Sequence, residues 1–149
     1  MLQAATAQDI AVIEALWLAE ERYIDPPEPL QIAAAANEGL LFVWQFEGRV
    51  AGFAALKRWH PGVFSLAAVV STVPGQGRAL VRAVQAQVFT ALDGHRLGLD
   101  TTYDNARALH LFEICGFIRE GVMRECWQRP DGEWADCIFM AILARDWQL

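Results

Sequence analysis

The chain has 149 residues, of which 54% are hydrophobic and 20% charged, and its formal net charge at neutral pH is −6. This composition excludes a disordered chain and predicts one globular domain, residues 1–149, with a sizeable core. The negative charge argues against a nucleic-acid partner, because phosphate binding needs clustered Lys and Arg, and Lys57 is the only lysine in the sequence.

The sequence also bears on location and redox state. No apolar run approaches the roughly 20 residues that cross a bilayer, and the N-terminus lacks a basic segment followed by an apolar one. We therefore expect a cytoplasmic protein without a membrane partner. Cys115, Cys126 and Cys137 are odd in number and have no C-x-x-C spacing, so we expect reduced thiols, with neither a disulfide framework nor a metal site.

The first sixty residues predict a strand, two helices and a hairpin. Thr6 with Asp9 resembles a capping box that starts the first helix, which ends before Asp25 because two prolines follow. Pro29 fits the first turn of the second helix, and Gly39 ends it. The predicted elements are a strand at 2–5, a helix from 6 to about 24, a helix from 29 to 36, strands at 40–46 and 49–56 around a two-residue turn, and a further turn at 59–62.

The second half alternates strands with helices. Apolar runs and alternating patterns predict strands, and apolar residues at helical spacing predict helices. The predicted strands are 63–70, 95–100, 117–127 and 134–143, the helices are 80–92 and 105–114, and a turn lies at 129–132. The order β-α-α-β-β-β-α-β-α-β-β indicates an α/β or α+β domain around one mixed sheet.

The most informative stretch of the sequence is the glycine-rich segment Val73–Leu80, which joins a predicted strand to a predicted helix. Free backbone N–H groups at a helix start bind phosphate or pyrophosphate without a basic side chain, because the helix dipole is positive there. Gly75 and Gly77 have no Cβ to hold a phosphate oxygen away from the backbone. Taken alone, the pattern fits a tight turn equally well.

A second motif lies about 30 residues downstream, in the run Asn105–Phe117. Together the two segments closely resemble the GNAT superfamily of N-acetyltransferases, with its Q/R-x-x-G-x-G/A loop, its N-x-x-A-x-x-x-Y motif and a Gly-Phe pair. The family resemblance covers residues 63–144, and within it the segment from His95 to Met140 is most similar to the ribosomal-protein and polyamine N-acetyltransferase branch. The matching residues are His95-Arg96-Leu97, Asn105, Ala108, Phe112, Gly116-Phe117, Glu120-Gly121, Arg124, Asp136 and Met140. The resemblance implies a mixed, mostly antiparallel sheet of six to seven strands flanked by about four helices.

The resemblance also implies a binding site for acetyl-CoA as co-substrate. The backbone of Ala68, Val69 and Val70 would pair with the pantetheine amides, and the N–H of Val70 or its neighbour would polarise the thioester carbonyl. Asn105 would either bond the pantetheine arm or cap its helix. The other implied cofactor-binding residues are Gly75, Gln76, Gly77, Arg78 and Ala79 at the pyrophosphate, and Phe112.

The sequence departs from the family pattern in two places, the glycine-rich loop and position 112. Thr72 stands where the loop usually opens with Gln or Arg, and Pro74 offers no N–H to a phosphate. Phe112 stands where many relatives place a tyrosine that donates a proton to the leaving thiolate. A thiolate whose pKa is about 8.5 needs little acid help near neutral pH, so the change weakens catalysis without excluding it. Tyr103 is a candidate substitute by residue type.

A general base must remove a proton from the amine before it attacks the thioester. Strand 63–70 carries no Glu or Asp, although relatives often place a Glu there. The catalytic candidates are Glu21, His60 and Tyr103; further carboxylates that fit are Glu20, Asp25, Glu28 and Asp100. Tyr23, Trp44 and Trp59 would line an acceptor pocket or belong to the core.

The resemblance implies a cytoplasmic N-acetyltransferase that moves the acetyl group directly to a primary amine of a small molecule or peptide, and it leaves a homodimer open. A catalytically weak or silent acyl-CoA-binding regulatory module is the alternative, with Thr72 and Phe112 as marks of lost chemistry. A nucleotide binder of Rossmann type is disfavoured, because the loop is not G-x-G-x-x-G and follows the fourth strand.

Overall fold

The computed structural model describes residues 1–28 and 30–148, which form one sheet flanked by helices. The strands in these residues are β1 (Leu2–Ala4), β2 (Leu41–Phe46), β3 (Arg49–His60), β4 (Val63–Ser71), β5 (Arg96–Thr102), β6 (Ile118–Gln128) and β7 (Trp134–Leu143). The α-helices are α1 (Ile10–Leu18), α2 (Gln31–Asn37), α3 (Gly77–Ala86) and α4 (Ala106–Ile114). The strand order β1-β2-β3-β4-β5-β7-β6 is antiparallel except between β4 and β5, which confirms the predicted fold class.

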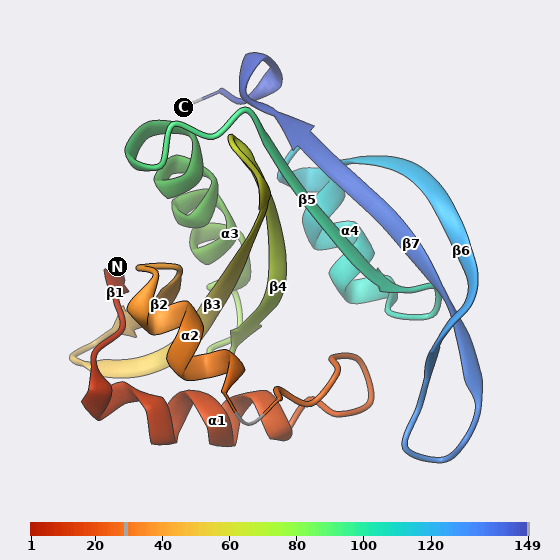
Figure 1. Ribbon diagram of the computed structural model, residues 1–149, viewed down its shortest axis with the longest axis horizontal. Helices are drawn as coiled ribbons and strands as arrows, with labels where there is room; N and C mark the ends of the chain where they lie inside the picture. Colours follow the sequence, from red (N-terminus) through yellow and green to blue (C-terminus); the bar gives the residue numbers. More distant parts are fainter. Residues whose placement is uncertain (29, 149) are drawn as a thin grey trace.

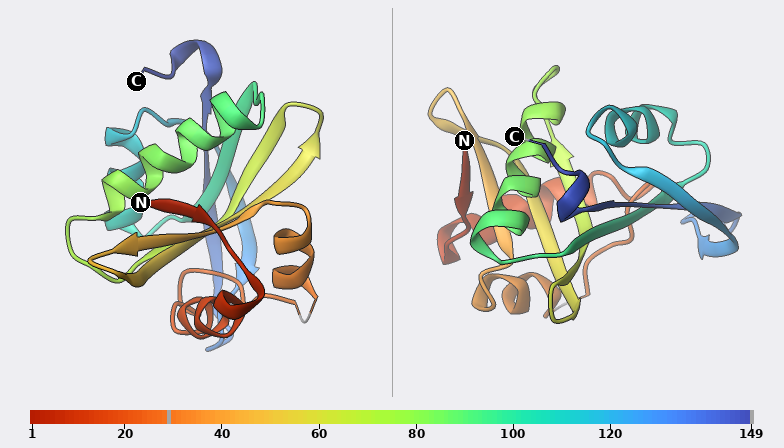
Figure 2. Two further views of the ribbon diagram at one scale, coloured as in Figure 1. Left: turned by 90° about the vertical axis from the view of Figure 1, so that its left-hand side faces the viewer. Right: turned by 90° about the horizontal axis from the view of Figure 1, so that it is seen from above.

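The two faces of the sheet bury two separate apolar clusters. Helices α1 and α2 cover one face, where Trp17 stacks on Phe53 with ring centroids 5.3 Å apart (Figure 1, Figure 2). Helices α3 and α4 cover the other face with Leu80, Val84 and Phe112. Because side chains alternate along a strand, β2 and β3 feed both clusters and read as continuous apolar runs.

A bulge in β4 reverses which side chains face which cluster. Ala55 of β3 pairs with Ala68, and Leu56 pairs with Leu66, so Ala67 is the extra residue. Leu66 belongs to the cluster under α3 and α4, whereas Ala68, two residues on, belongs to the cluster under α1 and α2. A bulge also increases the local twist of a strand. It therefore bends β4 away from its neighbour at the middle of the sheet.

Strands β4 and β5 diverge beyond this point. They pair in parallel only over Val63–Ser65 and Arg96–Gly98, and the rest of each strand has a free edge toward the other. Figure 1 shows the gap widening from the top of the view to the bottom. This divergence of the two strands opens a cleft in the centre of the sheet.

Several element boundaries differ from the predictions. The turn expected at 59–62 is shorter, because β3 continues to His60 and only Pro61-Gly62 turns. The helix expected at 80–92 already begins at Gly77 and changes at Gln87–Ala91 into a π-helical turn, in which Leu92 N–H donates to Gln87 O. The first helix ends at Leu18. Pro29 lies outside the described residues. Within those residues, no helix has the length and apolarity of a membrane-spanning segment.

Candidate active site

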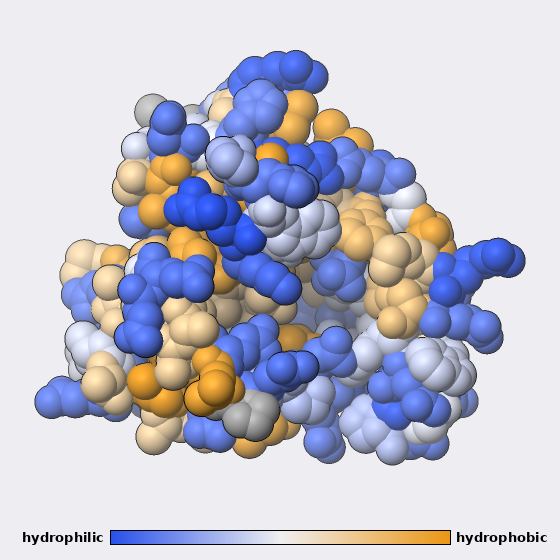
Figure 3. Space-filling view, viewed as in Figure 1, coloured by the Kyte–Doolittle hydropathy of each residue, from blue (hydrophilic) through white to orange (hydrophobic). Residues whose placement is uncertain are grey.

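Two cavities meet in the cleft between β4 and β5. The inner cavity, of about 230 Å³, extends toward α4 and is lined by Leu99, Asn105, Phe112, Cys126, Trp127 and Cys137, among others. The outer cavity, of about 840 Å³, opens toward α1 and α2 and is lined by Trp17, Glu28, Gln31, Glu38, Lys57 and Trp59, among others. Figure 3 shows a hollow on this face of the molecule, with hydrophilic side chains around it.

Three residues line both cavities: Asp25, Ala67 and Asp100. Ala67 is the bulge residue of β4, and Asp100 lies across the gap on β5, two residues beyond the last β4–β5 pair. Asp25 lies in the segment after α1, which loops toward the lower end of the gap in Figure 1. Trp17 fixes this segment, because its Nε1–H donates to the backbone oxygen of Asp25 at 2.7 Å.

The two shared carboxyls are held in an acidic environment. Burial raises the pKa of Asp25, and the indole of Trp127 partly offsets this. Burial also raises the pKa of Asp100, the negative charge of Asp25 raises it further, and a hydrogen bond from Cys137 lowers it. The outer cavity adds Glu28 and Glu38 against the single cation Lys57. A cleft with this balance of charge attracts cations and lowers their desolvation penalty.

The glycine-rich segment lies at the start of α3, on the opposite side of the sheet from α1 and α2. Gly75 has a φ of +82°, which a side chain disfavours, and a Cβ on Gly77 would meet Leu111 Cδ2 at 3.2 Å. Within the part of the chain that the structure describes, the backbone N–H groups of Gly75, Gly77, Arg78 and Ala79 donate no hydrogen bond to another backbone group. Four amides therefore point away from the protein at the positive end of a helix dipole.

Gln76 and Thr72 are engaged within the protein instead. The N–H of Gln76 donates to Val73 O at 3.2 Å, and its side-chain oxygen accepts from Trp44 Nε1 at 3.3 Å. Thr72 Oγ1 donates to Ala51 O at 3.0 Å, which ends the β3–β4 ladder. The Thr72 side chain is therefore occupied away from any loop ligand.

The register of β4 decides which of its amides face the cleft. Thr72 N–H donates to Ala51 O, and the pairs Phe53–Val70 and Ala55–Ala68 continue this bonded set. In an antiparallel ladder bonded pairs alternate, so Val70 and Ala68 direct their backbone groups to β3. Val69 and Ser71 direct theirs toward the gap. Of the two amides that the sequence left open for the thioester, the geometry therefore favours the neighbour of Val70.

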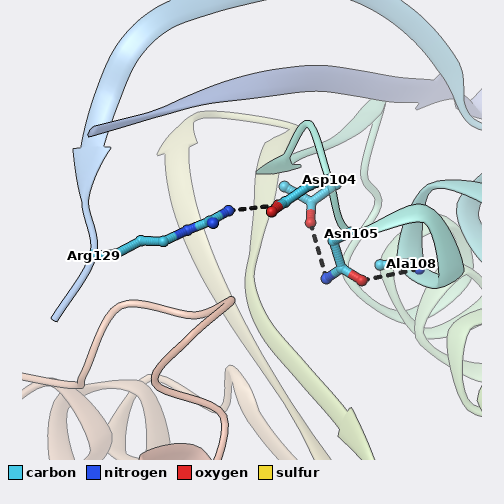
Figure 4. A network of polar contacts seen from close by, with 5 residues as sticks. Asp104, Asn105, Ala108 and Arg129 are labelled. Atoms are coloured by element: carbon cyan, nitrogen blue, oxygen red, sulfur yellow. Dashed lines mark hydrogen bonds and ion pairs between the residues drawn. The ribbon is translucent and has the colours of Figure 1, made fainter. Parts of the chain in front are cut away.

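A polar network fixes the loop between β5 and α4 beside the inner cavity (Figure 4). Asn105 caps α4, since its Oδ1 accepts from Ala108 N–H at 3.3 Å while its Nδ2 donates to Thr101 Oγ1 at 3.4 Å. Arg129, at the end of β6, is buried and pairs with Asp104 at 2.5 Å. Of the two roles considered for Asn105, the structure shows the cap. Phe112 is buried edge-to-face against Phe117 with ring centroids 5.6 Å apart.

The sequence-predicted catalytic residues lie elsewhere. In the part of the chain that the structure describes, Glu21, His60 and Tyr103 are not among the residues lining either cavity. His60 lies at the end of β3 beside the tight turn, and Tyr103 is 58% exposed in the β5–α4 loop. Of the other candidates, Asp25, Glu28 and Asp100 line the cleft.

Cys126 and Trp127 line the inner cavity although no sequence motif predicts it. Cys126 lies within an irregularity in β6 and Trp127 ends it, because three residues between Met123 and Trp127 stand opposite one residue of β7. Glu125 there has a φ of +46°, and its N–H donates to Asp136 Oδ1 at 2.8 Å. A bulge of this kind re-aims side chains, and no local motif marks it in the sequence.

Comparison with known proteins identifies the class that this fold and site define. Residues 10–117 match the acetyltransferase (GNAT) family, and the chain belongs to this family, whose members use acetyl-CoA. The family predicted from the two motifs is therefore confirmed.

Individual N-acetyltransferases are similar to this chain in sequence or in structure. Spermidine N(1)-acetyltransferase of Vibrio cholerae is 37% identical over 51 residues, 34% of this chain, and the chain spans only 30% of that relative. The crystal structure of spermidine N-acetyltransferase from Vibrio cholerae in complex with CoA and spermine superposes with a TM-score of 0.82 at 22% identity, covering 98% of this chain and 96% of the other. Ribosomal-protein-alanine N-acetyltransferase from Brucella melitensis gives 0.76 at 19% identity, covering 96% and 99%.

Proposed function

We propose that this protein transfers the acetyl group of acetyl-CoA directly to the amino group of a cationic small molecule or peptide. The observation that carries the proposal is the cleft between β4 and β5. It has free helix-start amides on one side of the sheet and an acid-lined cavity on the other. A cofactor and an acceptor that enter from opposite faces meet at the gap between the strands, which brings the reacting atoms together.

Acetyl-CoA would be held mainly by backbone groups. The pyrophosphate would lie against the amides of Gly75, Gly77, Arg78 and Ala79, with the exposed Arg78 side chain beside it. The pantetheine arm would add to the free edge of β4 at Val69, in the manner of an extra strand. Phe112 would border the acetyl end from α4. The N–H of Val69 would then polarise the thioester carbonyl.

The acceptor would enter through the outer cavity. Asp25, Glu28, Glu38 and Asp100 line it against Lys57 alone, so a compound with several ammonium groups suits it better than an anionic amine. The two structural relatives are named for spermidine and for a ribosomal protein's alanine, which are both cationic acceptors at neutral pH. We therefore place polyamines first and basic peptides second.

Cofactor binding is tested by thermal unfolding with acetyl-CoA. We expect a stabilisation of about 2.7 kcal/mol when acetyl-CoA exceeds its Kd about 100-fold, seen as a rise in Tm. Gly77→Val should abolish most of the shift, because a branched side chain crowds the loop amides against Leu111. Gly121→Ala is the control, since a Cβ there meets nothing within 4 Å. An unshifted wild-type Tm at millimolar acetyl-CoA would overturn the proposal.

Acetyl transfer is tested by release of the CoA thiol with spermine, an alanine-terminated basic peptide and glutamate as acceptors. We expect turnover with the first two and none with glutamate, because the cavity repels a carboxylate. Binding of acetyl-CoA without thiol release for any amine would instead favour the silent acyl-CoA-binding module. The buried Phe112, which has no hydroxyl to offer, is the observation that keeps this alternative in view.

A further inference from the structure

We propose that Asp100 removes the proton from the attacking amine, and that Asp25 holds the incoming ammonium group beside it. This inference rests on the proposed acetyl transfer and assigns residues to it. The assignment rests on where Asp25 and Asp100 lie in the fold, and the sequence candidates Glu21, His60 and Tyr103 have no part in it.

The position of Asp100 in its strand is the first argument. Leu97 and Leu99 point into the cluster under α3 and α4, so Asp100 points to the opposite face of the sheet, the face from which the outer cavity opens. At this point β4 no longer pairs with β5, so the Asp100 carboxylate borders the gap between the strands. It lies opposite the bulge at Ala67, close to the free backbone edge of β4 at Val69.

The junction of the two cavities is the second argument. A base for this reaction must reach the amine at the point where the amine, coming from the outer cavity, meets the thioester in the gap. Among the charged residues that the structure describes around the cleft, only Asp25 and Asp100 line both cavities. Glu28, Glu38 and Lys57 line the outer cavity only, and Tyr23, Cys126 and Cys137 line the inner cavity only.

The neighbours of Asp100 suit it to the role of a base. Partial desolvation in the cleft and the charge of Asp25 raise the pKa of Asp100, so its carboxylate binds a proton more strongly than an isolated carboxylate in water. The pKa of Cys137 is also raised, chiefly by burial, so this neighbour stays a neutral thiol that donates to the carboxylate. Each unit by which the pKa rises makes proton removal from an ammonium group tenfold less unfavourable.

The reaction exchanges the carbon–sulfur bond of the thioester for a carbon–nitrogen bond and removes two protons from the nitrogen. An R–NH3⁺ group held beside Asp25 gives one proton to the Asp100 carboxylate, which becomes a carboxylic acid. The neutral nitrogen forms a bond to the thioester carbon, whose oxygen is stabilised by the Val69 N–H. The carbon–sulfur bond then breaks, and the second proton on nitrogen goes to the departing sulfur to give CoA–SH. Asp100 returns its proton to water through the outer cavity.

The experiment measures kcat and KM for spermine between pH 5 and 9, at saturating acetyl-CoA, in the wild type and three variants. Asp100→Asn should lower kcat at least 100-fold and remove its acidic limb, while the acetyl-CoA thermal shift persists. Asp100→Glu should restore part of kcat. Glu38→Gln should raise KM and keep the acidic limb, because Glu38 lines the outer cavity alone.

Asp25→Asn separates the two roles. It should raise the KM for spermine, because one partner of the ammonium group is lost. It should also move the acidic limb of kcat to lower pH, because the negative charge that raises the pKa of Asp100 is gone.

Two results overturn the assignment. A kcat of Asp100→Asn within threefold of wild type, or a change in KM alone, would make Asp100 a binding group only. An acidic limb that survives in Asp100→Asn would assign the titration to another group. Failure of the proposed function is distinguishable, because it appears in the wild type as acetyl-CoA binding without thiol release.

Discussion

At the scale of single residues, three aspartates beside the cleft differ in the direction of their pKa shifts. Asp104 pairs with a buried arginine, and this hydrogen bond holds its pKa below the ordinary value. Asp25 and Asp100 both line the cleft, where partial desolvation raises the pKa of each. The first carboxyl therefore stabilises the fold in its ionised form, whereas ionisation of the other two costs stability.

Removing Asp104 should destabilise the protein. Asp104→Asn leaves the Arg129 guanidinium buried without its charged partner, and we expect a loss of about 2 kcal/mol, because the Asp104 side chain is still 28% exposed. The corresponding fall in Tm is about 4–8 °C. Thermal unfolding at neutral pH measures it. The lowered pKa of Asp104 adds stability above the unfolded value, and this is lost as pH falls through the folded pKa, so the deficit should shrink below about pH 3.9.

Removing Asp100 should have the opposite effect on stability. Because its pKa is raised in the folded protein, the ionised carboxylate destabilises the fold at neutral pH, and the penalty disappears as pH falls below the unfolded value of about 3.9. Asp100→Asn should therefore have a higher Tm than wild type at pH 8, with the difference closing toward pH 4. A lower Tm at pH 8 would contradict this account and would show that the carboxylate contributes to stability. Functional residues commonly carry such a penalty.

At the scale of elements, the β3–β4 ladder controls the site because it aims the backbone of β4. Its tightest point is Gly52, where a Cβ would lie 2.2 Å from Val70 O and 3.2 Å from Ser71 Cα. These are backbone atoms, so no side chain can rotate to make room. The bulge at Ala67 and the pairing at Val70 together set which amides face the gap.

Gly52→Ala should therefore affect both stability and cofactor binding. We expect a loss of about 3 kcal/mol in unfolding free energy, since the added methyl group displaces backbone. We also expect weaker acetyl-CoA binding, because the free edge of β4 moves with Val70. Denaturant unfolding and titration with acetyl-CoA measure the two effects. Gly121→Ala, on edge strand β6, should change neither by more than about 0.5 kcal/mol.

At the scale of the whole molecule, one sheet joins two apolar clusters into a single unit. Trp17, in the cluster under α1 and α2, holds the segment at Asp25, and the cluster under α3 and α4 holds the glycine-rich segment and Phe112. Both clusters take side chains from β2, β3 and β4, so neither face can be built without the other. A single domain of residues 1–149 stays a prediction that unfolding can test.

We expect the two faces to unfold together. Trp17→Ala removes a fully buried side chain and its stacking on Phe53, so it should cost about 4 kcal/mol and lower Tm by about 10 °C. The midpoints seen by tryptophan fluorescence and by far-UV circular dichroism should coincide in wild type and variant. Two separated transitions, with only one shifted by Trp17→Ala, would indicate that the faces are independent units.

The fold class could be predicted because its signals are local. The apolar alternation of 134–143 predicts a strand whose observed bounds are the same, and the Glu47-Gly48 turn has positive φ at both residues, as a two-residue hairpin requires. The glycine loop and the Asn105 cap likewise depend on residues close together in sequence. The family could be predicted from these two motifs, because each motif is recognised from residues only a few positions apart, whatever the rest of the chain does.

The catalytic side of the cleft depended on tertiary structure. Asp25 and Asp100 are 75 positions apart, and they meet because Trp17 fixes one segment while the bulge at Ala67 opens the gap beside the other. A bulge shifts the alternation of side chains by one residue and leaves no mark in composition. The sequence therefore could not predict which face of the sheet the side chains of Ala68 and Val69 lie on. By itself the sequence determined the fold class and the family, because these rest on local propensities and spacings, and it predicted a phosphate-binding loop at residues 75–79. Only the tertiary structure decided which carboxylates line the cleft, because long-range packing determines which segments of the chain meet there.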